Sequence, residues 1–326
     1  MMKFLALLLS ILTLGSNSAI AQDFSIVKTA NEATPRHENG FVAAGDKLYL
    51  IGGRGIKPVE AFDPKTNKWE KLGETPLEIH HFQPVAYQGK IYIMGAFTGK
   101  YPHETPIPNV LIFDPEKDQW HTGPSIPENR HRGAAACAVN GEKAYITGGI
   151  IDGHSNGTVN WLDEFDFETE KWTALPDAPH RRDHVTSAIA DGHLYIIGGR
   201  QSDYHEEGNF AAFFKTNQRA VDKYDIAGKK WTTLSDSLPV ATAGGGAVYF
   251  KDKIYYTGGE TAQKKAHHQV QAYSLKSQTW DVSGSLEKGR HGTCLTLSGK
   301  ILYIASGSEN QGGGPELSSI ESVVLR

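Results

Sequence analysis

The sequence is poor in cysteine, in long apolar runs and in net charge. It contains 2 cysteines among 326 residues, too few for a disulfide-stapled scaffold, and no long hydrophobic run follows the first twenty or so positions. Lys and Arg total 33 against 37 Asp and Glu, whereas a nucleic-acid-binding surface requires a basic excess. With 39% apolar residues, we expect a globular protein with a large core, no membrane span and no nucleic-acid partner.

The first residues have the composition of a secretory signal. Lys3 precedes an apolar run over residues 4–14, and Ala19-Ile20-Ala21 supplies the small residues of a cleavage site. We predict a signal peptide over 1–21 and one domain over 22–326, in a periplasmic or secreted protein. Export permits disulfides. However, the repeats described below place Cys137 and Cys294 in the first strands of two units on opposite sides of a ring, so both thiols are expected to be free and buried.

A short hairpin recurs along the whole chain. Its clearest copy has a tight turn at Asp191-Gly192, followed by an apolar strand that ends on Gly198-Gly199. Five relatives of this hairpin share a tyrosine at the same position, so that the six copies carry Tyr49, Tyr92, Tyr145, Tyr195, Tyr255 and Tyr303. One structural unit is therefore repeated six times.

A second motif follows five of these hairpins: an aromatic residue, usually Asp, a polar turn and then Trp. The tryptophans Trp69, Trp120, Trp172, Trp231 and Trp280 stand 51, 52, 59 and 49 residues apart. This period, with the paired glycines and the tyrosine, resembles the kelch repeat, which implies an all-β, six-bladed β-propeller. The last blade lacks one strand, and we predict that residues 24–29 close it beside residues 320–325.

Strand parity in such a blade puts two kinds of loop on one face: the loop between the second and third strands, and the connection between blades. Thirteen residues before the repeat tyrosine, four blades carry an arginine: Arg36, Arg132, Arg182 and Arg290. Around the axial mouth, these arginines would form a positive focus for a carboxylate, sulfate or phosphate group. The alternative is that each arginine ties neighbouring blades together.

Histidines form a second column, one residue later. His37, His80 and His291 belong to three blades that are neighbours once the ring closes, and His81 and His184 stand one step farther on. The first three could hold a Zn²⁺, Mn²⁺ or Cu²⁺ ion, supply general acid and base, or form a hydrogen-bonded scaffold.

Loops on the same face add further candidates. The longest, from Arg200 to about Arg219, contains Tyr204 and His205 and is expected to be a lid or specificity loop, or else a solvated loop packed on the neighbouring blade. Trp161, outside the repeat column, could stack on a sugar or pack between blades. The remaining polar loop residues include Tyr101, His103, Glu104, Asp152, His154 and Glu260.

Two groups of kelch enzymes are relevant to the activity of this chain, one excluded by its residues and one similar to it. Galactose oxidases take metal ligands from the segments before the first strands, but no tyrosine stands there in this chain, so copper-radical oxidation is not expected. Residues 182–188 and 258–262 resemble segments of the bacterial sialic acid mutarotases (N-acetylneuraminate epimerases). That resemblance implies that Arg182 binds a ligand carboxylate, and that Glu260 with His184 or His81 transfers protons.

The sequence thus predicts an exported kelch propeller that binds a small acidic sugar or oligosaccharide at its axial mouth, with mutarotase or epimerase chemistry. Elimination on a uronate sugar and metal-dependent catalysis by the axial histidines are alternatives. A non-enzymatic binding or scaffold module with a protein partner is a further alternative. No cofactor is expected, apart from a divalent transition metal in the metal-dependent case.

Overall fold

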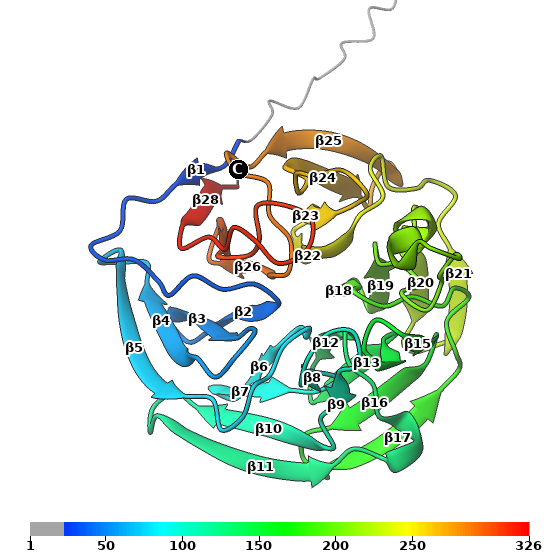
Figure 1. The fold of residues 1–326 in the computed structure, drawn as a ribbon, viewed down its shortest axis with the longest axis horizontal. Helices are drawn as coiled ribbons and strands as arrows, with labels where there is room; N and C mark the ends of the chain where they lie inside the picture. The colour runs from blue at the N-terminus through cyan, green and yellow to red at the C-terminus, as the bar shows by residue number, and fades with distance from the viewer. Residues whose placement is uncertain (1–22, 326) are drawn as a thin grey trace, which may run out of the picture.

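The computed structural model describes residues 23–325, which form six four-stranded antiparallel sheets arranged around one axis (Figure 1). This arrangement confirms the predicted all-β, six-bladed propeller. The predicted signal peptide, residues 1–21, lies outside the described residues and stays a prediction.

The first three blades each take their four strands from one stretch of chain. Blade 1 consists of β2 (Asn39–Ala44), β3 (Lys47–Gly52), β4 (Pro58–Asp63) and β5 (Lys68–Glu74). Blade 2 consists of β6 (Val85–Tyr87), β7 (Lys90–Ile93), β10 (Asn109–Asp114) and β11 (Gln119–Ser125). Blade 3 consists of β12 (Ala136–Asn140), β13 (Lys143–Thr147), β16 (Leu162–Asp166) and β17 (Lys171–Leu175).

The second half of the ring differs at its last blade. Blade 4 consists of β18 (Thr186–Ala190), β19 (His193–Ile197), β20 (Asp222–Asp225) and β21 (Lys230–Thr233). Blade 5 consists of β22 (Ala243–Phe250), β23 (Lys253–Glu260), β24 (Gln269–Ser274) and β25 (Thr279–Ser285). Blade 6 has β26 (Leu295–Ser298), β27 (Ile301–Ala305) and β28 (Ile320–Val324), completed by β1 (Ser25–Ile26) from the other end of the described chain.

The pairing of β1 with β28 closes the ring as predicted. Ser25 lies opposite Ser322 and Ile26 opposite Glu321, and Figure 1 shows the two strands side by side at the edge of the disc. The closing strand is shorter than the predicted 24–29, although Phe24 and Val27 flank it with further backbone hydrogen bonds. Closure covers the edge of β28, which would otherwise be open to pairing with another chain.

Small elements in the loops were not predicted. β8 (Phe97–Thr98) pairs with β9 (Thr105–Pro106), and β14 (Ile150–Asp152) pairs with β15 (Asn156–Thr158). Two 3₁₀ helices add to them, η1 (Glu128–Arg130) and η2 (Phe210–Thr216). β8, β9, β14, β15 and η2 all lie in loops between second and third strands, so they build the walls of the axial mouth. The described residues contain no helix of the length and apolarity that a membrane span needs.

The repeat hairpin has the geometry that its sequence indicates. Ala190 pairs with His193, and the two residues between them have positive φ angles, 47° at Asp191 and 73° at Gly192, as a two-residue primed turn requires. At the other end of β19, a side chain on Gly198 would stand 2.7 Å from the carbonyl oxygen of Thr242 in the next blade. Glycine there allows the two backbones to approach.

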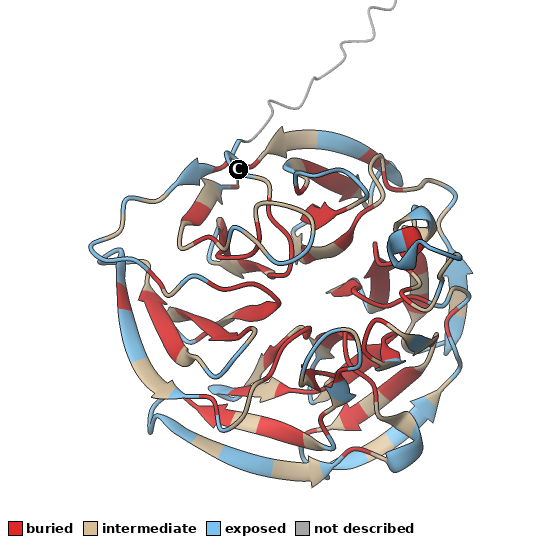
Figure 2. Ribbon diagram, in the orientation of Figure 1, coloured by how far each residue is buried: buried red, intermediate tan, exposed pale blue. Residues whose placement is uncertain are grey.

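Aromatic pairs form the wider, outer part of blades 1 to 5. Each repeat tryptophan lies opposite an aromatic residue of the third strand, as in Phe62 with Trp69, whose ring centroids are 5.0 Å apart. Buried residues are concentrated in the inner strands, and the outermost strands are largely exposed (Figure 2). Cys137 is buried and Cys294 only partly so, which corrects the expectation for the second thiol; both cysteines are free, as predicted.

Candidate functional site

A ring of six backbone positions surrounds the axis at one face. These positions lie eleven residues before the repeat tyrosines, and all have left-handed backbone conformations: Glu38, His81, Ala134, His184, Gly244 and Gly292. The backbone N–H of each of the last five members donates to the carbonyl of the preceding member over 2.8–3.0 Å, from His81 to Glu38 around to Gly292 and Gly244. Asn39 completes the circle by donating to Gly292 over 3.1 Å.

Three members of this ring carry polar side chains in a conformation that favours glycine. The φ angles are 56° for Glu38, 56° for His81 and 49° for His184, whereas two other positions of the ring are glycine. A residue with a side chain costs about 1 kcal/mol or more there. Such strain is concentrated at functional sites in proteins, so Glu38, His81 and His184 mark this mouth as the candidate site.

A pocket of about 570 Å³ opens above the ring. Its floor includes Glu38 and His81, and its walls come from the loops of five blades, among them Tyr101, Arg200 and Phe213. A smaller cavity of about 40 Å³ continues along the axis, where His184 joins Glu38 and His81 as a lining residue. The ring side chains therefore stand between the pocket and the axial channel. The volume suits a small-molecule ligand.

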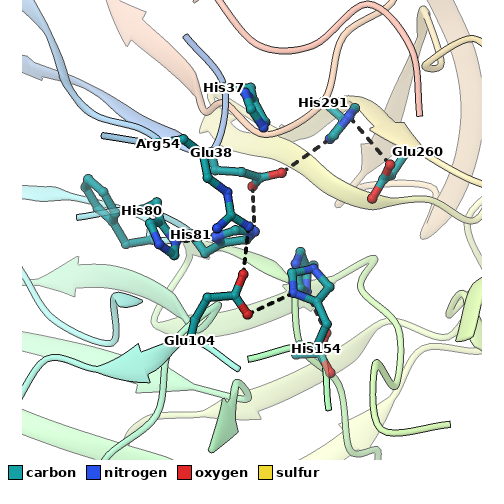
Figure 3. Close-up of polar contacts among 12 residues, drawn as sticks. His37, Glu38, Arg54, His80, His81, Glu104, His154, Glu260 and His291 are labelled. Atoms are coloured by element: carbon teal, nitrogen blue, oxygen red, sulfur yellow. Dashed lines mark hydrogen bonds and ion pairs between the residues drawn. The ribbon is translucent and has the colours of Figure 1, made fainter. Parts of the chain in front are cut away.

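Glu38 lies at the centre of a chain of acidic and imidazole groups (Figure 3). Its Oε2 is 3.3 Å from Nε2 of His81 and its Oε1 is 3.6 Å from Nδ1 of His291, while His291 Nε2 is 3.5 Å from Oε2 of Glu260. Burial raises the pKa of Glu38, but the nearby histidines, His291 foremost, outweigh this effect and keep the pKa below the usual range. Glu38 is thus an anion at the pocket floor.

The two ring nitrogens of His184 have different surroundings. Its Nδ1 is 2.6 Å from Oδ1 of Asp183, whose carboxylate also accepts hydrogen bonds from Ser202 and Thr158. The Nε2 atom is buried with no hydrogen-bond partner in the described part of the chain. Burial, helped by the positive charge of Arg200, lowers the pKa of His184 to about 4, so the imidazole is neutral at pH 7.

Arg200 and Glu260 form one wall of the pocket. Arg200 Nη1 donates to Glu260 Oε1 over 2.6 Å, and its guanidinium lies 4.5 Å from the centroid of the Phe213 ring. Burial raises the pKa of Glu260, but His291, Arg200 and the amide of Gly312 outweigh burial and hold it at about 2. Glu260 is therefore a fixed carboxylate rather than a proton donor at neutral pH.

The opposite wall carries a second acid–base group. Glu104 accepts from Nη2 of Arg54 over 2.7 Å and lies 3.2 Å from Nδ1 of His154. Burial raises the pKa of Glu104, but His154 and Arg54 hold it at about 2. The Arg54 guanidinium is partly exposed and lines the pocket, where it can meet an anionic ligand.

The four arginines of the repeat column do not form the predicted positive focus. Each is buried and paired with a carboxylate in the third strand of its own blade: Arg36 with Glu60, Arg132 with Asp163, Arg182 with Asp222, and Arg290 with Glu321. Each also donates to backbone carbonyls, and within residues 23–325 none of the four lines the pocket. Their contacts also show that they tie strands within a blade rather than neighbouring blades.

The predicted metal set is also rearranged. His37 pairs with Glu316 over 2.7 Å, His291 lies between Glu38 and Glu260, and His80 Nδ1 contacts His81 Nδ1 at 2.6 Å. His37, His80 and His291 therefore have separate partners. The structure instead gathers His81, His154 and His184, with one nitrogen of each ring within 4.8 Å of the others.

The remaining predicted residues lie around the site with local partners. Trp161 stacks under Arg130 at 4.4 Å, the Tyr204 hydroxyl donates to Glu206, and His205 stacks on Phe210 at 4.1 Å. Among the described residues, these three stand outside the set that lines the pocket, whereas Arg200, Glu260 and His81 belong to it.

Sequence reasoning missed Glu38 and Arg54. Glu38 stands in register with His81 and His184, eleven residues before Tyr49, so reading blade 1 one residue past His37 would have found it. Arg54 directly follows the paired glycines of blade 1, as Arg200 follows those of blade 4. That shared position was the signal for the pocket arginines.

The fold and its repeat define a six-bladed, kelch-like β-propeller. A family model for the Attractin/LZTR1 beta-propeller matches residues 17–259, well over half of the chain, and the chain belongs to this family.

Curated relatives include Kelch-like protein terF of Aspergillus terreus, 28% identical over 84% of this chain and 61% of the relative. Kelch-like protein 40 of Xenopus tropicalis is 25% identical over 62% of this chain and 32% of its own. The chain thus spans about three fifths and about a third of these two relatives. The solved structure of YjhT matches with a TM-score of 0.75 at 18% identity, covering 89% of this chain and 95% of that one, which shows the shared fold.

Proposed function

We propose that the axial mouth binds a small acidic carbohydrate and catalyses the proton transfers of ring opening and closure, as a mutarotase or epimerase. One observation carries this proposal: a buried carboxylate, Glu38, stands at the pocket floor between the imidazoles of His81 and His291.

The chemistry requires one group that accepts a proton and one that donates. Opening a cyclic hemiacetal takes a proton from the anomeric hydroxyl and gives one to the ring oxygen, and closure reverses both transfers. Nε2 of His291 lies 2.9 and 2.8 Å from the carbonyl oxygens of Asn310 and Gly312, so this nitrogen is a donor. Its Nδ1 faces Glu38, and together the two groups can hold and move one proton.

Recognition of an acidic group falls to residues of the pocket wall. Arg54, Arg200 and Lys100 line the pocket, which is roomy enough for a monosaccharide. The ring of Phe214, which is partly exposed, provides an apolar surface of the kind on which a sugar ring stacks. The carboxylate-binding role implied for Arg182 therefore passes to Arg54, which is partly exposed, with Lys100 beside it.

Anomer exchange provides the direct test. The rate of anomer interconversion would be measured by NMR for two acidic sugars, N-acetylneuraminate and galacturonate, and for neutral galactose. The protein should accelerate the interconversion of an acidic sugar. The Glu38→Gln protein should lose about 100-fold or more of this rate, the range of general acid–base catalysis. Arg54→Gln should weaken the binding of acidic sugars more than the binding of galactose. His205→Gln serves as the matched control. Sugar binding without faster exchange in the wild type would refute the enzymatic proposal.

A binding platform is the second candidate, favoured by exposed apolar side chains around the same mouth. Five such residues stand in the loops between second and third strands of blades 1–4: Ile56, Tyr101, Ile151, Tyr204 and Phe210. Large exposed apolar groups in one region are typical of protein contact surfaces. A photo-crosslinker at Tyr204 would test this role, because a protein partner should give a discrete adduct that the Phe210→Ser variant loses.

A further inference from the structure

We propose that His81, His154 and His184 form a binding site for a divalent first-row transition metal ion, with Zn²⁺ as the best-suited ion. The three side chains come from blades 2, 3 and 4 and are all buried. Their ring centroids are 4.6 to 5.3 Å apart, and one nitrogen of each ring lies within 4.8 Å of the others. This set differs from the histidines that the sequence suggested.

Carboxylates fix the tautomers of two of these imidazoles. Asp183 lies 2.6 Å from Nδ1 of His184, and Glu104 lies 3.2 Å from Nδ1 of His154. An ionised carboxylate only accepts hydrogen bonds, so both Nδ1 atoms carry the proton. Each neutral ring then has its lone pair on Nε2. A metal-binding histidine is oriented in the same way, with its other nitrogen bound to a carboxylate.

The third imidazole reaches the same state through another histidine. His80 Nε2 lies 3.0 Å from the carbonyl oxygen of Gly99, so this nitrogen donates and Nδ1 of the neutral His80 ring accepts. The 2.6 Å contact between the two Nδ1 atoms then requires His81 to be the donor. The lone pair of His81 is left on Nε2, which faces the Glu38 carboxylate at 3.3 Å.

Three imidazoles whose lone pairs are on Nε2 therefore lie close together, beside the Glu38 carboxylate. The Nε2 atom of His184 is buried and unpartnered in the described part of the chain. An unsatisfied buried acceptor is destabilising, and two facing acceptors repel each other. A cation bound by the three Nε2 atoms would remove both costs.

The charge around the cluster suits a divalent ion. Glu38, Glu104 and Asp183 contact the three histidines, and the Arg54 guanidinium pairs with one of these carboxylates. Arg200, whose positive charge also reaches His184, is paired with Glu260, so four negative charges less two positive charges leave two negative charges around the imidazoles. Three imidazole nitrogens are a ligand set of zinc sites that keep a position open, and Cu²⁺, Ni²⁺ and Co²⁺ also accept them.

A second group, His80 with His81 and Glu104, is less suited. Its carboxylate already accepts from Arg54, whose positive charge would oppose a metal ion at the same oxygen atoms. In addition, His80 and His81 use their Nδ1 atoms on each other. A metal ion bound by His81, His154 and His184 would leave both of these contacts intact.

Metal content is the test, and it does not depend on the sugar activity. Protein made without a histidine tag would be stripped with chelator, titrated with ZnCl₂ by calorimetry, and analysed for zinc after dialysis. The wild type should retain one equivalent, and Co²⁺ should produce the visible absorption of a low-coordinate cobalt site. His184→Gln and His154→Gln should each lose the bound ion, and Asp183→Asn should bind zinc about 10–100-fold more weakly.

His37→Gln is the matched control, because His37 also lines the mouth but pairs with Glu316. It should bind zinc as the wild type does. If His184→Gln fails to fold, judged by circular dichroism, His154→Gln from the β14–β15 loop still decides the outcome. A wild type that retains no zinc or cobalt, or a folded His154→Gln protein with wild-type affinity, would overturn the metal site.

Discussion

The buried pair of Arg182 and Asp222 gives the sharpest test of what the arginine column does. Arg182 Nη2 donates to Asp222 Oδ2 over 2.8 Å, and its Nη1 donates to the carbonyls of Gly198 and Ala220. Both side chains are almost fully buried. The perturbation is Arg182→Met, which keeps the apolar stem and removes the charge and the donors.

The expected loss follows from the aspartate that remains. Removing one partner of a buried ion pair typically costs about 3–5 kcal/mol, because the other charge stays buried with too few partners. Asp222 would keep only its contacts with His180 and Thr233. For a domain of this size, about 2 °C of melting temperature corresponds to each kcal/mol, so Tm should fall by about 6–10 °C. The double variant Arg182→Met with Asp222→Leu leaves no unpaired charge and should lose less than Arg182→Met alone.

Thermal unfolding followed by circular dichroism measures this cycle. The neighbouring Arg181, whose guanidinium is about half exposed in its pair with Asp203, provides the control, and Arg181→Met should change Tm by no more than about 2 °C. A scaffold role also predicts that Arg182→Met leaves acidic-sugar affinity unchanged. An unaltered Tm together with lost sugar binding would refute the reasoning and restore Arg182 as a ligand residue.

Three further predictions concern a pocket carboxylate, a thiol and a glycine. The pKa of Glu260 falls from 4.5 to about 2 on folding, so it contributes about 3 kcal/mol above pH 5 that is lost as pH falls toward 2; Glu260→Gln should flatten the acid side of the Tm–pH curve, and an equally steep curve would contradict this assignment. Burial raises the pKa of Cys137 to about 12, so a thiol reagent at pH 8 should not label it until the protein unfolds, and rapid labelling of the native protein would exclude the buried position. A side chain on Gly246 would stand 2.1 Å from the backbone nitrogen of Leu295 in the next blade; Gly246→Ala should therefore lower stability by about 1–3 kcal/mol, and a variant as stable as wild type would show that the blades can separate there.

The fold was predictable because the repeat makes one local pattern testable six times. The Asp191-Gly192 turn, the paired glycines and the tryptophan spacing each specify backbone geometry or core packing at short range. The ribbon pairs β8–β9 and β14–β15 escaped prediction because they lie in loops whose sequences do not repeat. The two ribbons also contact each other through β9 and β14, a long-range contact that the repeat does not encode.

The site was predictable in position but not in side-chain direction. Counting from the tyrosine correctly placed His81 and His184 at the axis. The same counting gave Arg182 a ligand role, because register does not tell whether a side chain points into the mouth or back into its own blade. The deciding information was a partner: Asp222 stands on the third strand, 40 positions away, and sequence spacing alone did not connect the two charges.

The circle of hydrogen bonds at the axis explains why only a few positions there have polar side chains. Each blade needs a left-handed residue where its N–H joins the circle of hydrogen bonds, and glycine serves this purpose without strain, as at Gly244 and Gly292. Four positions depart from that solution at an energetic cost: Ala134 with a methyl group only, and Glu38, His81 and His184 with polar side chains that meet at the axis. The circle itself needs none of these polar side chains, which is why the proposed proton transfers and the proposed metal ion are both placed there.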